Sequence, residues 1–260
     1  MAYSSIIYTK EAHIARITLN RAESGNVIDR QLAQELAETC LGIKQDDEIF
    51  VVTITGAGEK AFSGGSELEK SVPQDSTPEK SVKTDEVSVA ASIAAIDRPV
   101  IAAINGDALG QGLELALSCD IRIATENAHF GFPQVALGLM PMDGGTQRLP
   151  RIVGKGKALE LIFTAETIDA REALEIGLVS KVVAQENLDS EVESLAKSIA
   201  GKGPIALRYI KEAINKGLDL TLDQGLRLEA DLYFLLHTTD DRTEGIRAFL
   251  EKRPPKFTGE

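Results

Sequence analysis

The sequence predicts an α/β core followed by a C-terminal helical region, within a chain of 260 residues. Strand-like apolar runs alternate with helical patterns in the first half of the chain. From about residue 155 onward the spacing of apolar residues is helical. Apolar residues make up 43% of the chain and charged residues 26%, which is typical of a globular protein with a sizeable core and excludes extensive disorder.

Strands are predicted where short apolar runs end at turn residues. Residues 14–19 alternate apolar and polar side chains, and this period of two predicts a half-buried strand. Residues 50–55 and 100–104 are continuous apolar runs, each followed by a turn that contains glycine, and residues 121–124 form a similar run. Such runs are typical of parallel strands that are covered on both faces.

Helical spacing over residues 29–43 and 87–96 lies between these strands, so we expect β-α-β units with right-handed crossovers. Residues 71–86 include two prolines and many polar side chains, and we predict a mobile surface loop there, beside the site. Later helices are predicted over residues 170–177, 188–199, 205–216, 222–236 and 241–251. Their apolar faces must be covered by this subunit or by a neighbouring one.

Charge and cysteine content exclude several classes of protein. The formal net charge of −12 lacks the basic surface that binding to nucleic acid needs. No run of 18 apolar residues predicts a membrane span, and no cluster of histidine and cysteine has the spacing of a metal site. Two cysteines, Cys40 and Cys119, cannot form a disulfide framework, and we interpret them as reduced core thiols of a cytoplasmic protein.

Two glycine-rich turns, residues 61–68 and 105–114, follow two of the predicted strands. Ligands of open parallel sheets bind at the carboxyl ends of strands, where glycines let the backbone N–H groups approach a ligand. Two N–H groups aimed at one point form an oxyanion hole. The alternative is that the glycines only make tight turns, but two such turns at adjacent strands favour a ligand site. Neither turn has the spacing of a nucleotide-binding motif.

Glu114 is the carboxylate in this region that is most suited to chemistry. It lies four residues after Gly110 and immediately before the apolar residues 115–117. A carboxylate in such a helix start is costly unless it is used or paired. Because apolar surroundings disfavour its charged form, the side chain suits a general acid or base. The alternative is that Glu114 caps its helix or pairs with a basic side chain.

Six stretches of the chain, in a fixed order, carry a resemblance to a known family. They are residues 61–68, 98–110, 114–116, 128–131, 144–149 and 173–179. Together they resemble the enoyl-CoA hydratase/isomerase (crotonase) superfamily over nearly the whole chain. The resemblance implies an α/β crotonase-like spiral of (ββα) units over residues 1–195 that binds acyl-CoA. It also implies a C-terminal helical region, residues 196–260, that supports trimerisation.

The resemblance also implies a set of binding residues. The family polarises the carbonyl group of an acyl-CoA thioester with two main-chain N–H groups, which match those of Ser66, after Gly65, and Gln111, after Gly110. The family usually has glycine where this chain has Gln111, so the side chain should narrow or polarise the mouth of the oxyanion hole. Leu68 matches the segment that lines the adenine of CoA. Coenzyme A is part of the substrate, and neither a separate cofactor nor a metal is implied.

Hydratases of this family use two glutamates, and this chain departs from that pattern. One glutamate matches Glu114, whereas the other matches Gln134, which can hydrogen-bond a water or a substrate oxygen but cannot exchange a proton at neutral pH. Another carrier is then needed, and the candidate is Asp143, because related dienoyl-CoA isomerases and dehalogenases place an aspartate in this same turn, one residue earlier. The alternative is that Asp143 caps the helix that follows it.

The resemblance implies reversible hydration of a 2-enoyl- or dienoyl-CoA thioester through an enolate that the oxyanion hole stabilises. Because Gln134 replaces a carboxylate, three alternatives stay open. They are double-bond isomerisation of an enoyl- or dienoyl-CoA, hydrolysis of a C–C bond in a 2-oxoacyl-CoA, and a CoA-binding protein with a decayed site. We expect a cytoplasmic homotrimer or homohexamer without nucleic-acid or membrane partners.

Overall fold

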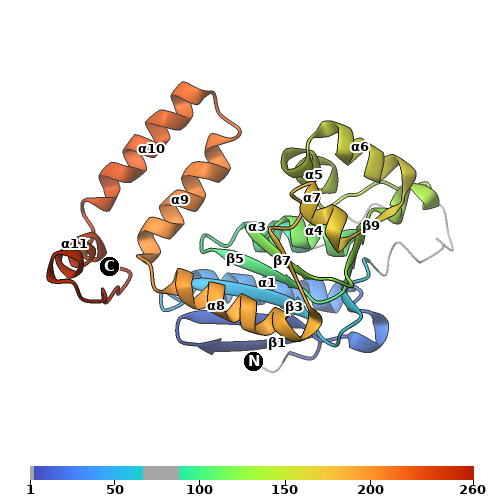
Figure 1. The fold of residues 1–260 in the computed structure, drawn as a ribbon, viewed down its shortest axis with the longest axis horizontal. Helices are drawn as coiled ribbons and strands as arrows, with labels where there is room; N and C mark the ends of the chain where they lie inside the picture. Colours follow the sequence, from blue (N-terminus) through green and yellow to red (C-terminus); the bar gives the residue numbers. More distant parts are fainter. Residues whose placement is uncertain (1–2, 67–87) are drawn as a thin grey trace.

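The computed structural model describes residues 3–66 and 88–260, which form two β-sheets, surrounding helices and a group of C-terminal helices (Figure 1). The larger sheet contains, in spatial order, β1 (Ile6–Glu11), β2 (Ile14–Leu19), β3 (Val51–Gly56), β5 (Val100–Ile104), β7 (Ile121–Thr125) and β10 (Lys181–Val183). β1 and β2 pair antiparallel, and the later neighbours in this sheet are parallel. All four predicted strands are confirmed.

The smaller sheet contains β4 (Ala61–Ser63), β6 (Asp107–Leu109), β8 (His129–Gly131) and β9 (Thr167–Asp169), in that order. The chain contributes strands to the two sheets in turn, since β3 is followed by β4, β5 by β6 and β7 by β8. Helix α3 (Val89–Ala94) precedes β5, and α4 (Gln111–Leu117) precedes β7. This progression is a spiral of strand–strand–helix units, and it confirms the predicted α/β fold class.

Side chains of the larger sheet point alternately into two apolar cores, as the pleat of a strand requires. Val52 and Ala102 belong to the core that packs against α1 (Arg30–Gln45), α3 and α4. Val51 belongs to the other core, which packs against α8 (Leu188–Ala200). Burial on both faces explains why the predicted strands read as continuous apolar runs rather than as alternating ones.

Helix α1 begins where the sequence predicts it. The side chain of Asp29 accepts a hydrogen bond from the N–H group of Leu32 at 2.8 Å, which caps the first turn. Leu32, Leu36 and Cys40 are buried at a spacing of four residues. The apolar face of the helix therefore covers the sheet, and the helix ends two residues later than predicted, at Gln45.

The remaining helices cover the smaller sheet or form the C-terminal group. They are the 3₁₀ turns η1 (Ala22–Ser24), η3 (Pro133–Leu137) and η4 (Gln185–Asn187), and helices α5 (Gly145–Val153), α6 (Lys155–Thr164), α7 (Ala170–Glu175), α9 (Pro204–Gly217), α10 (Leu222–Leu236) and α11 (Asp240–Glu251). The later helices are confirmed, with each end within two residues of its predicted position. Helix α8 runs across the division predicted between residues 195 and 196, which stays a prediction.

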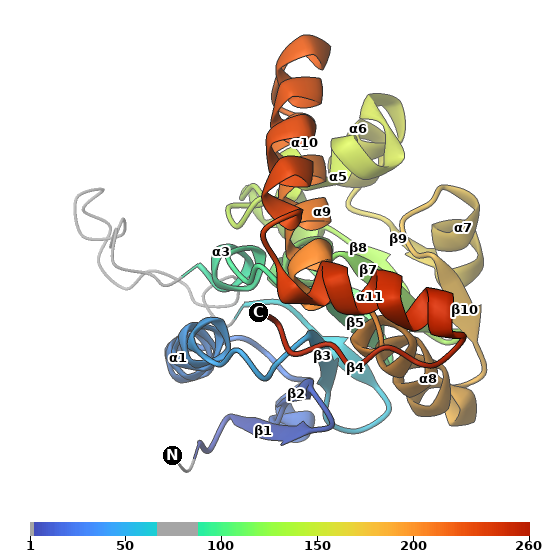
Figure 2. The same ribbon diagram turned by 90° about the vertical axis from the view of Figure 1, so that its left-hand side faces the viewer.

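Figures 1 and 2 show α10 rising from α11 and extending away from the sheets together with α9. The Nζ atom of Lys211 on α9 donates to the Asp120 carboxylate at 2.7 Å and to the main-chain oxygen of Arg98 at 2.9 Å, which fixes α9 to the core. No helix within the described residues has the length and apolar character that crossing a membrane requires. The loop predicted over residues 71–86 lies outside the described residues.

Candidate active site

The two glycine-rich turns lie side by side because the strands that carry them are paired. β4 and β6 are parallel neighbours, with Ser63 opposite Ala108. The first turn leaves β4 and the second leads from β6 into α4. An ideal Cβ atom on Gly112 would lie only 2.2 Å from the main-chain oxygen of Ser63, so the start of α4 packs directly against the end of β4. The predicted approach of the two turns is therefore observed.

The first turn is held against the segment before α1. The N–H group of Gly64 donates to the oxygen of Gly25 at 2.9 Å, and the N–H group of Ile28 donates to the oxygen of Gly65 at 2.8 Å. Ser66 is 7% exposed and forms an isolated parallel bridge with Ile28. The main chain at the first predicted oxyanion position is thus anchored. Leu68, the residue predicted to line the adenine of CoA, lies outside the described residues.

The second turn places Gln111 at the first position of α4. The N–H group of Gly110 donates to the oxygen of Gly131 on β8 at 3.0 Å, which attaches the turn to the smaller sheet. The first N–H groups of an α-helix have no partner within the helix, so their dipoles can act on a bound oxygen atom. The side-chain Nε2 atom of Gln111 donates to Oδ2 of Asp143 at 3.2 Å. This hydrogen bond holds the Gln111 side-chain amide against the turn that contains Asp143.

Glu114 lies one turn into α4, and its side chain is 1% exposed. Its Oε1 atom accepts hydrogen bonds from the main-chain N–H groups of Asp143 and Gly145, both at 2.7 Å. Gly145 permits this approach, because a Cβ atom there would lie 3.0 Å from Oε1 and 2.7 Å from the ring of Phe132. The buried carboxylate is therefore fixed by backbone donors, beside an apolar ring.

Asp143 is half-buried and does not cap the helix that follows it, so that alternative is wrong. α5 has Gly144 at its N-cap, with no side-chain cap hydrogen bond. The Asp143 carboxylate instead accepts hydrogen bonds at the start of α3, from the Ser88 hydroxyl and from the N–H group of Ala90 at 3.1 Å. Tertiary packing brings the start of α3 to this turn. The Asp143 carboxylate therefore binds α3 and not α5, the helix that follows it in the sequence.

Gln134 lies on η3 and is 1% exposed. It follows Phe132, whose ring lies beside Gly145 and therefore near the Glu114 carboxylate. This placement brings a neutral amide to the position that the resemblance assigns to a second glutamate. Met140 and Met142 lie in the same turn region as Asp143 and are largely exposed.

The chemistry of this region depends on carboxylates, amides and main-chain groups. Burial raises the pKa of both Cys40 and Cys119 to about 12, so neither thiol supplies a thiolate nucleophile near neutral pH. Within residues 3–66 and 88–260, no group of three histidine, cysteine or acidic side chains could hold a metal ion. Proton transfer and main-chain hydrogen bonding are the chemistry that the site itself offers.

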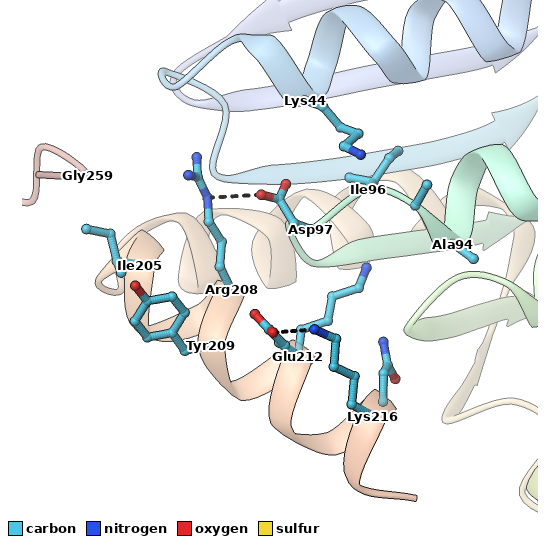
Figure 3. A pocket seen from close by; sticks show the side chains of 13 residues that line it. Lys44, Ala94, Ile96, Asp97, Ile205, Arg208, Tyr209, Glu212, Lys216 and Gly259 are labelled. Atoms are coloured by element: carbon cyan, nitrogen blue, oxygen red, sulfur yellow. Dashed lines mark hydrogen bonds and ion pairs between the residues drawn. The ribbon is translucent and has the colours of Figure 1, made fainter. Parts of the chain in front are cut away.

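A pocket of about 680 Å³ lies beyond the amino end of β5, between α9 and the segment that leads into this strand (Figure 3). Several of its charged groups already have partners. Arg208 lies 3.2 Å from a carboxylate oxygen of Asp47 and faces Asp97, and Lys216 pairs with Glu212 at 2.6 Å. The pocket faces the amino ends of the strands, so it lies apart from the two glycine turns.

Sequence reasoning missed Ser88, Gly145 and Arg148. Ser88 precedes an apolar helical run, which is a local signal for an N-cap, but nothing local connects it with Asp143. Gly145 falls within the family stretch 144–149, but nothing local indicates that its N–H group donates to the Glu114 carboxylate. The Nη1 atom of Arg148 donates to the main-chain oxygen of Asp143 at 2.8 Å and supports the same turn.

A spiral of strand–strand–helix units, with a buried carboxylate between two paired glycine turns, defines a protein of the crotonase fold class. The sequence model of the enoyl-CoA hydratase/isomerase family matches residues 9–260, and the chain belongs to this family of enzymes. The predicted superfamily is thereby confirmed.

Named relatives agree with this assignment. The crotonyl-CoA hydratase of Syntrophomonas wolfei is 42% identical over 99% of both chains. The short-chain-enoyl-CoA hydratase of Clostridium acetobutylicum is 40% identical over 97% of both chains. The crystal structure of an enoyl-CoA hydratase from Bacillus anthracis superposes with a TM-score of 0.94 at 41% identity, and it covers 99% of this chain and 100% of its own.

Proposed function

We propose that this enzyme catalyses the reversible hydration of a 2-enoyl-CoA thioester. The observation that carries the proposal is the Glu114 carboxylate, which is buried and fixed by two main-chain N–H groups beside the paired glycine turns. The names of the relatives from Syntrophomonas wolfei and Clostridium acetobutylicum support hydration as the reaction. Membership of an enzyme family leaves the alternative of a CoA-binding protein with a decayed site without support.

In the proposed reaction, the N–H groups of Ser66 and Gln111 bind the thioester carbonyl oxygen. They stabilise the negative charge that develops on this oxygen when water adds to the β-carbon. As the water oxygen forms a bond to the β-carbon, the Glu114 carboxylate accepts a proton from the water, and the double-bond electrons move toward the carbonyl oxygen to give the enolate. Glu114 then delivers this proton to the α-carbon and returns to its carboxylate form, while Gln134 orients the water through its amide.

Double-bond isomerisation is the second candidate, and a specific observation favours it. Gln134 replaces the second proton-exchanging group, and a single carboxylate is sufficient to move a proton between two carbons. The Asp143 carboxylate is held by hydrogen bonds to α3 and Gln111, at the turn that also holds Glu114. We infer that Asp143 assists proton transfer only if its side chain faces the reacting carbons.

The test of hydration follows the absorbance of the conjugated double bond of crotonyl-CoA. We expect the parent enzyme to remove this absorbance, and Glu114→Gln to lower kcat by roughly 10²- to 10⁴-fold because the general acid–base group is lost. Glu126→Gln is the matched control. Glu126 is exposed and directly follows β7, so this variant should retain parent activity. Equal activity of Glu114→Gln and parent would remove Glu114 from the mechanism.

The competing reaction is tested with a 3-enoyl-CoA. Appearance of the conjugated product without hydroxyacyl-CoA, from an enzyme inactive on crotonyl-CoA, would replace hydration by isomerisation. In that case Gln134→Glu should introduce hydration, because it restores a second proton-exchanging group. Asp143→Asn should slow isomerisation only if its carboxylate carries a proton during the reaction.

The acyl group of the substrate, the oligomeric state and the cellular location are also proposals. We propose that acyl-CoA is the substrate partner, with an apolar acyl group, because Phe132 is fully buried beside Glu114 and two methionines flank the same turn. A homotrimer or homohexamer is proposed from the family resemblance and from exposed apolar side chains on the C-terminal helices. A cytoplasmic location is supported by the free, buried thiols of Cys40 and Cys119.

A further inference from the structure

The Asp143 residue connects both halves of the proposed catalytic machinery. Its main-chain N–H group holds the Glu114 carboxylate at 2.7 Å, and its side-chain Oδ2 atom accepts from the Gln111 amide at 3.2 Å. One residue therefore contacts the proposed acid–base group and the side chain of a proposed oxyanion residue. A shift of Asp143 would be transmitted to both groups.

The Asp143 carboxylate is itself held by the start of α3. Oδ2 also accepts from the N–H group of Ala90 at 3.1 Å, and Oδ1 accepts from the hydroxyl of Ser88. The Ser88 oxygen in turn accepts from the N–H group of Ala91 at 2.9 Å, which makes Ser88 the N-cap of α3. The hydroxyl group of Ser88 is thus at once a helix cap and a donor to the Asp143 carboxylate.

We propose that Ser88 is a positioning residue of the active site, acting through Asp143. Its hydroxyl fixes the Asp143 carboxylate, and the fixed residue keeps the Glu114 carboxylate and the Gln111 side chain in place. Ser88 and Asp143 are 55 positions apart in the sequence, so the link exists only in the fold. The inference rests on the proposed function in one respect: Glu114 must be the group that exchanges protons.

The test compares Ser88→Ala with Ser88→Thr, Asp143→Asn and the double variant Ser88→Ala/Asp143→Asn. We expect Ser88→Ala to lower kcat on crotonyl-CoA roughly 10- to 100-fold, with KM within about twofold, because small displacements of a catalytic group are costly. Ser88→Thr should restore most of kcat, because it keeps the hydroxyl. The double variant should be no slower than Asp143→Asn, because Ser88 acts only through that carboxylate.

Ser92→Ala is the matched control for loss of α3 structure. Ser92 lies one turn along the same helix, and its hydroxyl donates to the main-chain oxygen of Ser88 at 2.9 Å rather than to the Asp143 carboxylate. We expect this variant to keep parent kcat. An equal loss in Ser92→Ala and Ser88→Ala, or losses from Ser88→Ala and Asp143→Asn that multiply in the double variant, would overturn the proposal.

A second readout separates this inference from the proposed hydration. Exchange of the α-proton of butyryl-CoA with deuterium from the solvent, followed by NMR, requires a base and a stabilised enolate but no addition of water. If the parent exchanges this proton without hydrating crotonyl-CoA, hydration fails as the function and Ser88→Ala must slow the exchange for our inference to stand. If Ser88→Ala matches the parent in both assays, our inference fails while hydration stands. A parent that catalyses neither reaction overturns both.

Discussion

Gly112 is the residue at which the two proposed oxyanion turns come closest. A Cβ atom there would lie 2.2 Å from the main-chain oxygen of Ser63 and 2.7 Å from its Cβ atom. Real Cβ atoms do not approach backbone atoms so closely, so any side chain would push α4 away from β4. Gln111 and Glu114 lie on α4, and the first turn follows β4 directly. The geometry of the site therefore depends on the absence of one methyl group.

We predict that Gly112→Ala lowers the free energy of unfolding by about 1–3 kcal/mol, as overpacking of a core does, and lowers hydration activity at least tenfold. Urea unfolding and the crotonyl-CoA assay measure the two effects. Gly42→Ala is the control, since Gly42 lies within α1 and a Cβ atom there meets nothing within 4 Å. That variant should be more stable than the parent by up to ~1 kcal/mol, with parent activity. Parent-like stability and activity in Gly112→Ala would show that the turns tolerate separation.

Single residues differ in how far the sequence predicts their environment. The position of Glu114 before an apolar run predicts a buried carboxylate in a helix start, and the structure confirms this placement. The partners of Asp143 are not predictable in this way, because Ser88 and Gln111 lie 55 and 32 positions away. Local patterns report which residues are buried along one element, whereas such contacts depend on how elements pack.

At the scale of elements, α11 and the tail after it are joined by an ion pair between Glu244, in the second turn of the helix, and Arg253. The Nη1 and Nη2 atoms of Arg253 donate to the two carboxylate oxygens of Glu244, at 2.6 and 2.8 Å. These hydrogen bonds, together with that from the main-chain N–H group of Lys256, lower the pKa of Glu244 to about 2. In its charged form this carboxylate holds Arg253 to α11, and Asp241 holds the tail further along, by accepting from the N–H groups of Thr258 and Gly259.

A pH dependence follows from the direction of this shift. Because the folded-state pKa of Glu244 is below its ordinary value of 4.5, its stabilising contribution is fully present above pH 4.5 and is lost as the pH falls toward 2. We predict that the Tm of the parent exceeds that of Glu244→Gln at pH 7 and that the difference shrinks between pH 4.5 and 3. High salt should also reduce it, because the pair is near the surface. A difference that is constant from pH 7 to 3 would contradict this role.

Whole elements were predictable where they are long and carry end signals. Helix α10 is capped by Thr221, whose side chain forms a capping box with Gln224, and its bounds match the prediction. The smaller sheet was not predicted, because each of its strands has only three residues and shows no measurable period. The predicted turns at residues 61–68 and 105–114 contain β4 and β6. The glycines in these segments favoured a prediction of turns, so the two short strands were missed.

At the scale of the whole molecule, the C-terminal helices expose more apolar surface than one subunit can cover. Ile210 and Ile214 on α9 and Leu218 at its C-cap follow one another at a spacing of four residues and are all more than half exposed. Phe234 on α10 and Phe249 on α11 are 73% and 83% exposed. Helices α9 and α10 extend away from the sheets (Figure 1), and these side chains are exposed to solvent in the single subunit.

We predict that these faces are buried between copies of the chain, so that light scattering after size exclusion gives three or six times the mass of 27.9 kDa. Burying one such aromatic side chain is worth about 1.5–3 kcal/mol, and a symmetric assembly repeats the contact in every subunit. Phe234→Asp should therefore shift the population toward monomer at micromolar concentration. Ile7→Asp is the control, because Ile7 is an exposed apolar residue on β1, which lies at the opposite side of the molecule from α9 and α10 (Figure 1), and it should leave the assembly intact. A monomeric parent, or an assembly that Phe234→Asp leaves unchanged, would mean that α9 to α11 do not form the interface.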